Sequence, residues 1–143
     1  MTHANADIDV LAKTIYGEAR GEYARHDAGL AGLIAVGNVA MNRLKAQSWF
    51  GKTLREVCLK PYQFSCWNPN DPNHDKLHSS TVTIEPLFDI CRWVAENVAE
   101  ERWPDLTKGS DHYHTVQVAP KWSKGQKPVI RIGCHVFFKL GGR

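Results

Sequence analysis

The spacing of apolar residues predicts three long helices. Apolar residues recur at intervals of three and four from residue 8 to 19, from about 27 to 45 and from 86 to about 102, a spacing that places them on one face of an α-helix. Gly17 and Gly21 are expected to loosen or end the first helix near Glu18, because glycine is a weak helix former. Small residues between Gly29 and Ala40 would let another helix approach the second one closely.

The C-terminal third has a different pattern. Residues 112–118 and 129–140 are rich in β-branched and aromatic residues, as strands are, and Gly133-Cys134 is a candidate hairpin turn. Residues 53–60 predict a short helix that Pro61 ends, and a long polar loop follows to residue 80. The sequence therefore predicts an α+β fold, mainly helical, with a small C-terminal antiparallel β-sheet.

Composition narrows the class of protein. The 143 residues fit a single domain over residues 1–143, and 43% hydrophobic with 23% charged residues is typical of a globular chain. No apolar run approaches the ~18 residues that span a bilayer. The net charge of +3 is not concentrated in a basic block, and the chain lacks nucleotide-binding glycine motifs. We expect a monomer with no cofactor, no metal, no nucleic-acid partner and no stable membrane association.

The start of the chain bears on localisation. Its first nine residues, MTHANADID, have neither the basic nor the apolar region of a secretory signal. We therefore expect the protein to stay in the cytoplasm until something releases it. In that reducing compartment, four cysteines without a CxxC pair are expected to be thiols, several of them buried.

Glu18 is the first candidate for chemistry. A glutamate in an apolar-walled cleft is favoured in its protonated form and can act as a general acid. The residues alone favour a solvated Glu18, or one paired with Arg20 or Arg25. Glu22 follows one helical turn later, so the two carboxyls could form a glycosidase pair. Alternatively, Glu22 is a solvated or supporting charge.

Three histidines form a second candidate group. His112 and His114 would point the same way on a strand, and with His135 on a neighbouring strand they could bind zinc. No HExxH motif accompanies them. They could instead be hydrogen-bonded or surface histidines, or contact a substrate. A catalytic pair of Cys66 or Cys134 with a histidine is a further formal alternative.

The loop segment PYQFSCWN, residues 61–68, combines aromatic rings with amides. Rings can stack on the C–H faces of a sugar while amides bond to its hydroxyl and acetamido groups. A hydrophobic plug beneath a long loop would have the same composition.

Taken in order, these motifs resemble one known family. LAKTIYGEARGE, GLIAVGNVAMNRLK, TLREVCLKPYQFSCWN, GSDHYHTVQVAPKWS and RIGCHVFFKL together resemble the SleB-like cell wall hydrolases over residues 10–140. The resemblance implies a lysozyme-like catalytic domain that cuts the glycan strands of bacterial peptidoglycan. It also implies that Glu18 is the catalytic acid/base. The substrate-binding candidates that accompany it are Tyr16, Glu22, Gln63, Phe64, Ser65, His112 and Tyr113.

The resemblance leaves two mechanisms open. A lytic transglycosylase would cut between N-acetylmuramic acid and N-acetylglucosamine and release a 1,6-anhydro product, with Glu18 as its one enzyme carboxyl. A muramidase would use a second carboxylate, for which the candidates are Asp27, Asp71, Asp75 and Asp111. The absence of a clear second carboxylate favours the transglycosylase. The rival classes are a zinc amidase or peptidase and a non-catalytic wall-binding module.

Spore-cortex enzymes of this family usually carry a signal peptide and a wall-binding domain. A bare catalytic domain with a cytosolic start resembles a phage or prophage endolysin that reaches the periplasm and cell wall through a holin lesion.

Overall fold

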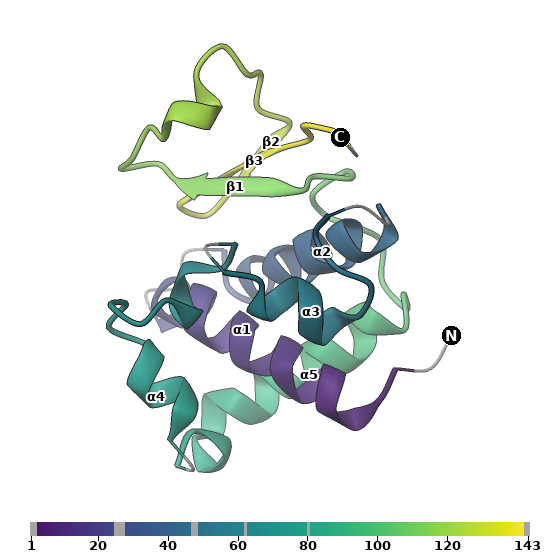
Figure 1. Ribbon diagram of the computed structural model, residues 1–143, viewed down its shortest axis with the longest axis vertical. Helices are drawn as coiled ribbons and strands as arrows, with labels where there is room; N and C mark the ends of the chain where they lie inside the picture. The colour runs from purple at the N-terminus through teal and green to yellow at the C-terminus, as the bar shows by residue number, and fades with distance from the viewer. Residues whose placement is uncertain (1–2, 25–27, 47–48, 62, 80, 142–143) are drawn as a thin grey trace.

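The computed structural model describes residues 3–24, 28–46, 49–61, 63–79 and 81–141. Helices come first along the chain and a sheet comes last, in the order that the sequence predicts (Figure 1). The α-helices are α1 (Asn5–Ala24), α2 (Leu30–Lys45), α3 (Leu54–Leu59), α4 (His74–His78) and α5 (Pro86–Ala99). Single-turn 3-10 helices lie at Ser65–Trp67, Val82–Ile84 and Lys121–Ser123, and the strands are β1 (His112–Thr115), β2 (Ile130–Ile132) and β3 (His135–Phe138).

The three predicted long helices are present, but the first does not end where its glycines suggested. α1 runs through Gly17 and Gly21 to Ala24. Glycine is up to about 1 kcal/mol less favourable than alanine in a helix, and tertiary packing offsets that cost here, since α1 packs against α2, α3 and α5. The prediction that α1 ends near Glu18 was therefore wrong.

The other helix ends also shift. α2 is described from Leu30, and the predicted start at Asp27 lies outside the described residues. α5 ends at Ala99 rather than at Arg102, and Glu101 takes a positive φ of 56° just beyond it.

The close helix contact predicted from the small residues of the second helix is confirmed: a Cβ on Gly37 would lie 3.2 Å from Val98 of α5.

One apolar core joins the helices and reaches the sheet. It includes residues with no exposed surface on α1, α2 and α5, such as Leu11, Leu33 and Val94, and it extends to Phe137 on β3. Cys58, Cys66 and Cys91 are buried thiols, as expected. Within the described residues, no helix has both the length and the apolar character needed to cross a bilayer.

The sheet is antiparallel with strand order β1-β3-β2. β2 and β3 form the predicted hairpin: Ile132 pairs with His135, and Gly133-Cys134 makes the two-residue turn, with Gly133 at φ 60°. β1 adds to the other side of β3, where Tyr113 pairs with Phe137. Figure 1 shows the sheet at one end of the helical layer. The expected α+β class is confirmed.

Asp105 fixes the segment that leads into β1. Its carboxylate accepts hydrogen bonds from Asn42 on α2 at 2.8 Å, from the backbone amide and hydroxyl of Thr107 at 2.7 Å each, and from the amide of Gly109 at 2.8 Å. Burial raises the pKa of Asp105, but these hydrogen bonds outweigh it and hold the pKa below its ordinary value. The polar network therefore ties the sheet to α2.

We expect Asp105→Ala to reduce the free energy of unfolding by about 3 kcal/mol, because four donors on Asn42, Gly109 and the buried Thr107 lose a charged acceptor. Asp105 has a lowered pKa in the folded state, so it stabilises the fold above its unfolded pKa and this contribution is lost as pH falls through the folded value. The difference between wild type and variant should shrink below about pH 4. Urea unfolding at neutral and acid pH measures both effects.

Asp75→Ala is the matched control, because the side chain of Asp75 is fully exposed. It should change stability by less than about 0.5 kcal/mol. Equal losses from the two substitutions would contradict the role of Asp105.

Candidate active site

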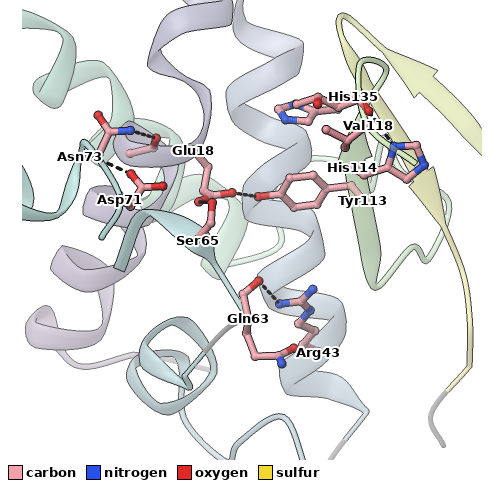
Figure 2. A pocket seen from close by; sticks show the side chains of 12 residues that line it. Glu18, Arg43, Gln63, Ser65, Asp71, Asn73, Tyr113, His114, Val118 and His135 are labelled. Atoms are coloured by element: carbon pink, nitrogen blue, oxygen red, sulfur yellow. Dashed lines mark hydrogen bonds between the residues drawn. The ribbon is translucent and has the colours of Figure 1, made fainter. Parts of the chain in front are cut away.

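A cavity of about 420 Å³ lies where α1, the loop after α3 and strand β1 meet. Figure 2 shows the side chains that converge on it. Its lining is mostly polar, which corrects the expectation of apolar walls around Glu18. The lining residues are Gly17, Glu18, Arg43, Gln63, Ser65, Asp71, Asn73, Tyr113, His114, Thr115, Val118 and His135.

Glu18 is the carboxyl group at the centre of this arrangement. It lies on α1 and is partly exposed. The hydroxyl of Tyr113 on β1 donates a hydrogen bond to its Oε1. The backbone amide of Cys66 donates to its Oε2 at 2.9 Å, and the hydroxyl of Ser65 donates to the same oxygen at 3.4 Å. Figure 2 shows the Tyr113 hydroxyl and the Glu18 carboxyl facing each other. Both oxygens of Glu18 are thus oriented by other segments of the chain.

Gly17 explains how the loop reaches Glu18. A Cβ at Gly17 would lie 2.7 Å from the Cβ of Cys66, a separation that real side chains do not adopt. The indole nitrogen of Trp67 also donates to Thr14 of α1 at 2.9 Å. Gly17 therefore serves the packing of the 3-10 turn Ser65–Trp67 against α1.

Tyr113 is a neutral donor to Glu18. Burial, and then the negative charge of Glu18, raise the pKa of Tyr113 well above its usual value. Its ring contacts His135, with centroids 4.8 Å apart, and Phe137, with centroids 5.5 Å apart. These contacts fix the direction from which the hydroxyl approaches Glu18.

Arg43 was missed by sequence reasoning. It comes from α2 and is 4% exposed, and burial lowers its pKa. Its Nε donates to the backbone oxygen of Asp111 at 2.8 Å, and its guanidinium lies 4.7 Å from the ring centroid of Phe64. The sequence did contain one sign of this role. Arg43 follows the small, apolar stretch of α2 by about one turn, at a position that faces neighbouring segments rather than solvent.

Glu22 and His135 form a buried pair behind Tyr113. Nδ1 of His135 contacts the Glu22 carboxylate directly, and the amide of Cys134 donates to Glu22 at 3.0 Å. Burial raises the pKa of Glu22, but the hydrogen bond and charge of His135, together with Cys134, lower it below its ordinary value. Glu22 is 3% exposed, so the solvated interpretation was wrong and the supporting one fits.

Four predicted substrate-binding residues do not line the cavity. Glu22 is buried, as described above. Tyr16 is 1% exposed, and its hydroxyl donates to Glu85 at 2.7 Å. Tyr16 and Glu18 are two positions apart on α1, so their side chains point to different sides of the helix. Phe64 is buried against Arg43. His112 lies on the opposite face of β1 from Tyr113, because strand side chains alternate. Gln63, Ser65 and Tyr113 line the cavity, and their contact with a substrate stays a prediction.

The proposed zinc triad of His112, His114 and His135 does not form. Thr115 pairs with His135 across β1 and β3, and directly paired residues share a face of the sheet. His135 therefore lies on the face of Tyr113, whereas His112 and His114 contact Trp122 on the other face. A zinc amidase built on these three histidines loses its ligand set.

Of the four candidates for a second carboxylate, one of the three that the structure describes lies in the cavity. Asp71 lines the cavity, and its carboxylate accepts from the amide of Asn73 at 2.8 Å. Asp75 is fully exposed. Asp111 contacts the ring of His112 and accepts from the amide of Leu140. Asp27 lies outside the described residues.

Cys66 is no candidate nucleophile, although its amide bonds to Glu18. Burial raises the pKa of the Cys66 thiol far above its usual value, so it stays protonated.

Comparison with known proteins identifies the family of the chain. Residues 27–138 match the family model described as Cell Wall Hydrolase. The chain belongs to the cell wall hydrolase family. The family match confirms the resemblance to the cell wall hydrolases and the prediction of an enzyme, and it favours an enzyme over a non-catalytic wall-binding module.

One curated relative matches this cell wall hydrolase over part of its length. The chain is 36% identical over 63 residues to the cell wall hydrolase CwlJ of Bacillus subtilis (strain 168), a match that covers 42% of this chain and 40% of the length of CwlJ.

Two solved structures share its fold. The SleB catalytic domain of Bacillus cereus matches 96% of this chain and 93% of that one, with a TM-score of 0.62 and 22% identity. The catalytic domain of the germination-specific lytic transglycosylase SleB from Bacillus anthracis matches 96% of this chain and 97% of that one, with a TM-score of 0.72 and 24% identity.

We expect Tyr113→Phe to lower kcat by about 10- to 100-fold while KM changes little, because it removes one hydrogen bond to the Glu18 carboxyl and leaves the ring contacts. Tyr16→Phe is the matched control: its hydroxyl bonds to Glu85 outside the cavity, so kcat should stay close to wild type. Initial rates of solubilisation of purified sacculi give both constants. A kcat loss for Tyr16→Phe equal to that for Tyr113→Phe would contradict this assignment.

Proposed function

We propose that this chain cuts peptidoglycan glycan strands between N-acetylmuramic acid and N-acetylglucosamine, with Glu18 as the general acid/base. The observation that carries the proposal is the Glu18 carboxyl, which opens into a cavity while donors from the loop and the sheet orient it. A reacting carboxyl needs both access and a fixed direction.

The other lining groups suit a sugar chain. Gln63 and Asn73 offer amides, and Ser65 and Thr115 offer hydroxyls. The volume of about 420 Å³ lies within the range of small-molecule sites. Sugar hydroxyl and acetamido groups need such donors and acceptors, so the lining supports a glycan substrate.

The proposed reaction needs one enzyme carboxyl. Protonated Glu18 gives its proton to the glycosidic oxygen as the bond to C1 breaks. The oxygen of the muramic 2-acetamido group attacks C1 from within the substrate, which removes the need for a protein nucleophile. Glu18, now ionised, takes the proton of the 6-hydroxyl, whose oxygen attacks C1 and displaces the acetamido oxygen, which restores the acetamido group and gives the 1,6-anhydro sugar. Glu18 ends the cycle protonated.

The structural similarity to the catalytic domain of the lytic transglycosylase SleB from Bacillus anthracis supports this outcome. Hydrolysis is the second candidate, because Asp71 lines the same cavity as Glu18 and could direct a water molecule to C1. A muramidase reaction would then leave a reducing end.

An endolysin role, with release from the cytoplasm to the cell wall, stays a prediction. So do a single catalytic domain over residues 1–143 and a monomeric state.

We expect Glu18→Gln to lose at least about 100-fold in the rate of glycan cleavage, the usual scale of general acid catalysis, because glutamine keeps the shape but carries no acidic proton. Glu96→Gln, on the exposed face of α5, is the matched control and should keep the wild-type rate. Release of muropeptides from sacculi measures the rate, and circular dichroism checks the fold. Near-wild-type cleavage by a folded Glu18→Gln variant would sink the assignment.

Asp71→Asn separates the two reactions. For a transglycosylase, the variant should still release anhydro-muropeptides, because no second carboxylate takes part. For a muramidase in which Asp71 activates water, the loss should approach that of Glu18→Gln, again about 100-fold. Mass spectrometry distinguishes the products, since the anhydro form is lighter by one water. Reducing ends from wild type, together with an inactive Asp71→Asn, would favour the muramidase.

A further inference from the structure

Beside the cavity, three side chains of different chemistry meet. Glu22 comes from α1, and Cys134 and His135 come from the turn and first residue of the β2–β3 hairpin. A carboxylate oxygen, the sulfur and a ring nitrogen lie within 4.8 Å of one another. Among the described residues, this is the group of histidine, cysteine and acidic side chains close enough to share a metal ion.

The ligand set matches one class of cation. Thiolate sulfur, imidazole nitrogen and carboxylate oxygen are the ligands of zinc, whereas calcium and magnesium prefer oxygen alone. Zinc at its usual bond lengths of about 2.0–2.3 Å brings such ligand atoms to within about 3–4 Å of one another. The half-buried side chain of Cys134 lies at the tip of a turn, with its sulfur within 4.8 Å of the other two ligand atoms.

The burial and the orientation of these three side chains also favour a shared ion. Glu22 and His135 are 3% and 5% exposed, and His135 presents its Nδ1 to the Glu22 carboxylate. The sulfur of Cys134 lies within 4.8 Å of both the Glu22 carboxylate and the His135 ring nitrogen, so it faces the same point. Three ligand groups therefore converge on one small volume from two separate elements.

We propose that Glu22, Cys134 and His135 bind a zinc-type divalent cation that joins α1 to the β2–β3 hairpin. On binding, the Cys134 thiol gives its proton to solvent, and the thiolate and Glu22 carboxylate together balance the two charges of the ion. His135 also gives up to solvent the Nδ1 proton that faces Glu22, so the neutral ring supplies the third ligand through Nδ1, and water completes a tetrahedral set. The site is distinct from Glu18 and takes no part in the proposed bond cleavage.

The location gives the ion a structural role. His135 contacts the ring of Tyr113, whose hydroxyl bonds to Glu18. An ion at this site links the β2–β3 hairpin, which lies behind Tyr113, to α1. Without the ion, the Glu22–His135 contact makes this link. Binding of the ion should therefore raise the melting temperature.

The test uses tag-free protein, reduced and stripped with EDTA. Isothermal titration with ZnCl₂ should give one ion per chain, and CoCl₂ should give the near-ultraviolet absorption band of a thiolate–cobalt bond. Zinc should also protect Cys134 from alkylation in the wild-type protein, mapped by peptide mass spectrometry. None of these measurements depends on catalysis, so the result stands apart from the proposed glycan cleavage.

Two variants locate the site. Cys134→Ser should abolish the cobalt–thiolate band and weaken zinc binding by at least about 100-fold, because losing a direct ligand costs no less than losing an outer partner. His114→Asn is the matched control: His114 lines the same cavity but lies outside the trio, so zinc binding should persist. No cobalt–thiolate band in wild type, no protection of Cys134, or loss of binding in His114→Asn would overturn the proposal and leave only an ion pair.

Discussion

The hydrogen bonds to the Glu18 carboxyl are the interaction on which the arrangement of the site depends. The acid belongs to a helix, but its donors belong to a loop nearly fifty residues later and to a strand nearly a hundred residues later. A carboxyl held from two sides has little freedom to turn. The helical layer alone therefore supplies the carboxyl without its orientation, and the sheet completes the arrangement through Tyr113.

Directional polar contacts place the sheet, in addition to the apolar core. Arg43 bonds to the backbone at Asp111, and Asn42 bonds to Asp105, just before β1. Glu22 reaches the hairpin from α1. Apolar burial is non-directional and would tolerate a shift of the sheet over the helices, whereas buried donors and acceptors allow few alternatives because each unmade bond is costly. The same contacts that stabilise the fold thus set where Tyr113 meets Glu18.

The sequence predicts those parts of the fold that local chemistry decides. The apolar faces of the helices, the Gly133-Cys134 turn and the order of helices and strands follow from periodicity and from the φ requirement of one glycine. The site is harder to predict because it depends on register. A single step along β1 decides that Tyr113, and not His112, faces Glu18, and the same pairing separates His135 from the other histidines. Arg43 was missed because its partners lie in segments distant in sequence.

Gly17 shows how a packing constraint becomes a chemical one. Its missing side chain lets the turn at Cys66 lie against α1, and that turn carries the amide that bonds to Glu18. The distance from the acid to its donor is thus set by the absence of one methyl group on the adjacent residue. The close approach of the two backbones therefore fixes the position of the carboxyl. A larger side chain at position 17 would push the turn away from α1, and the amide donor of Cys66 would move away from Glu18 with it.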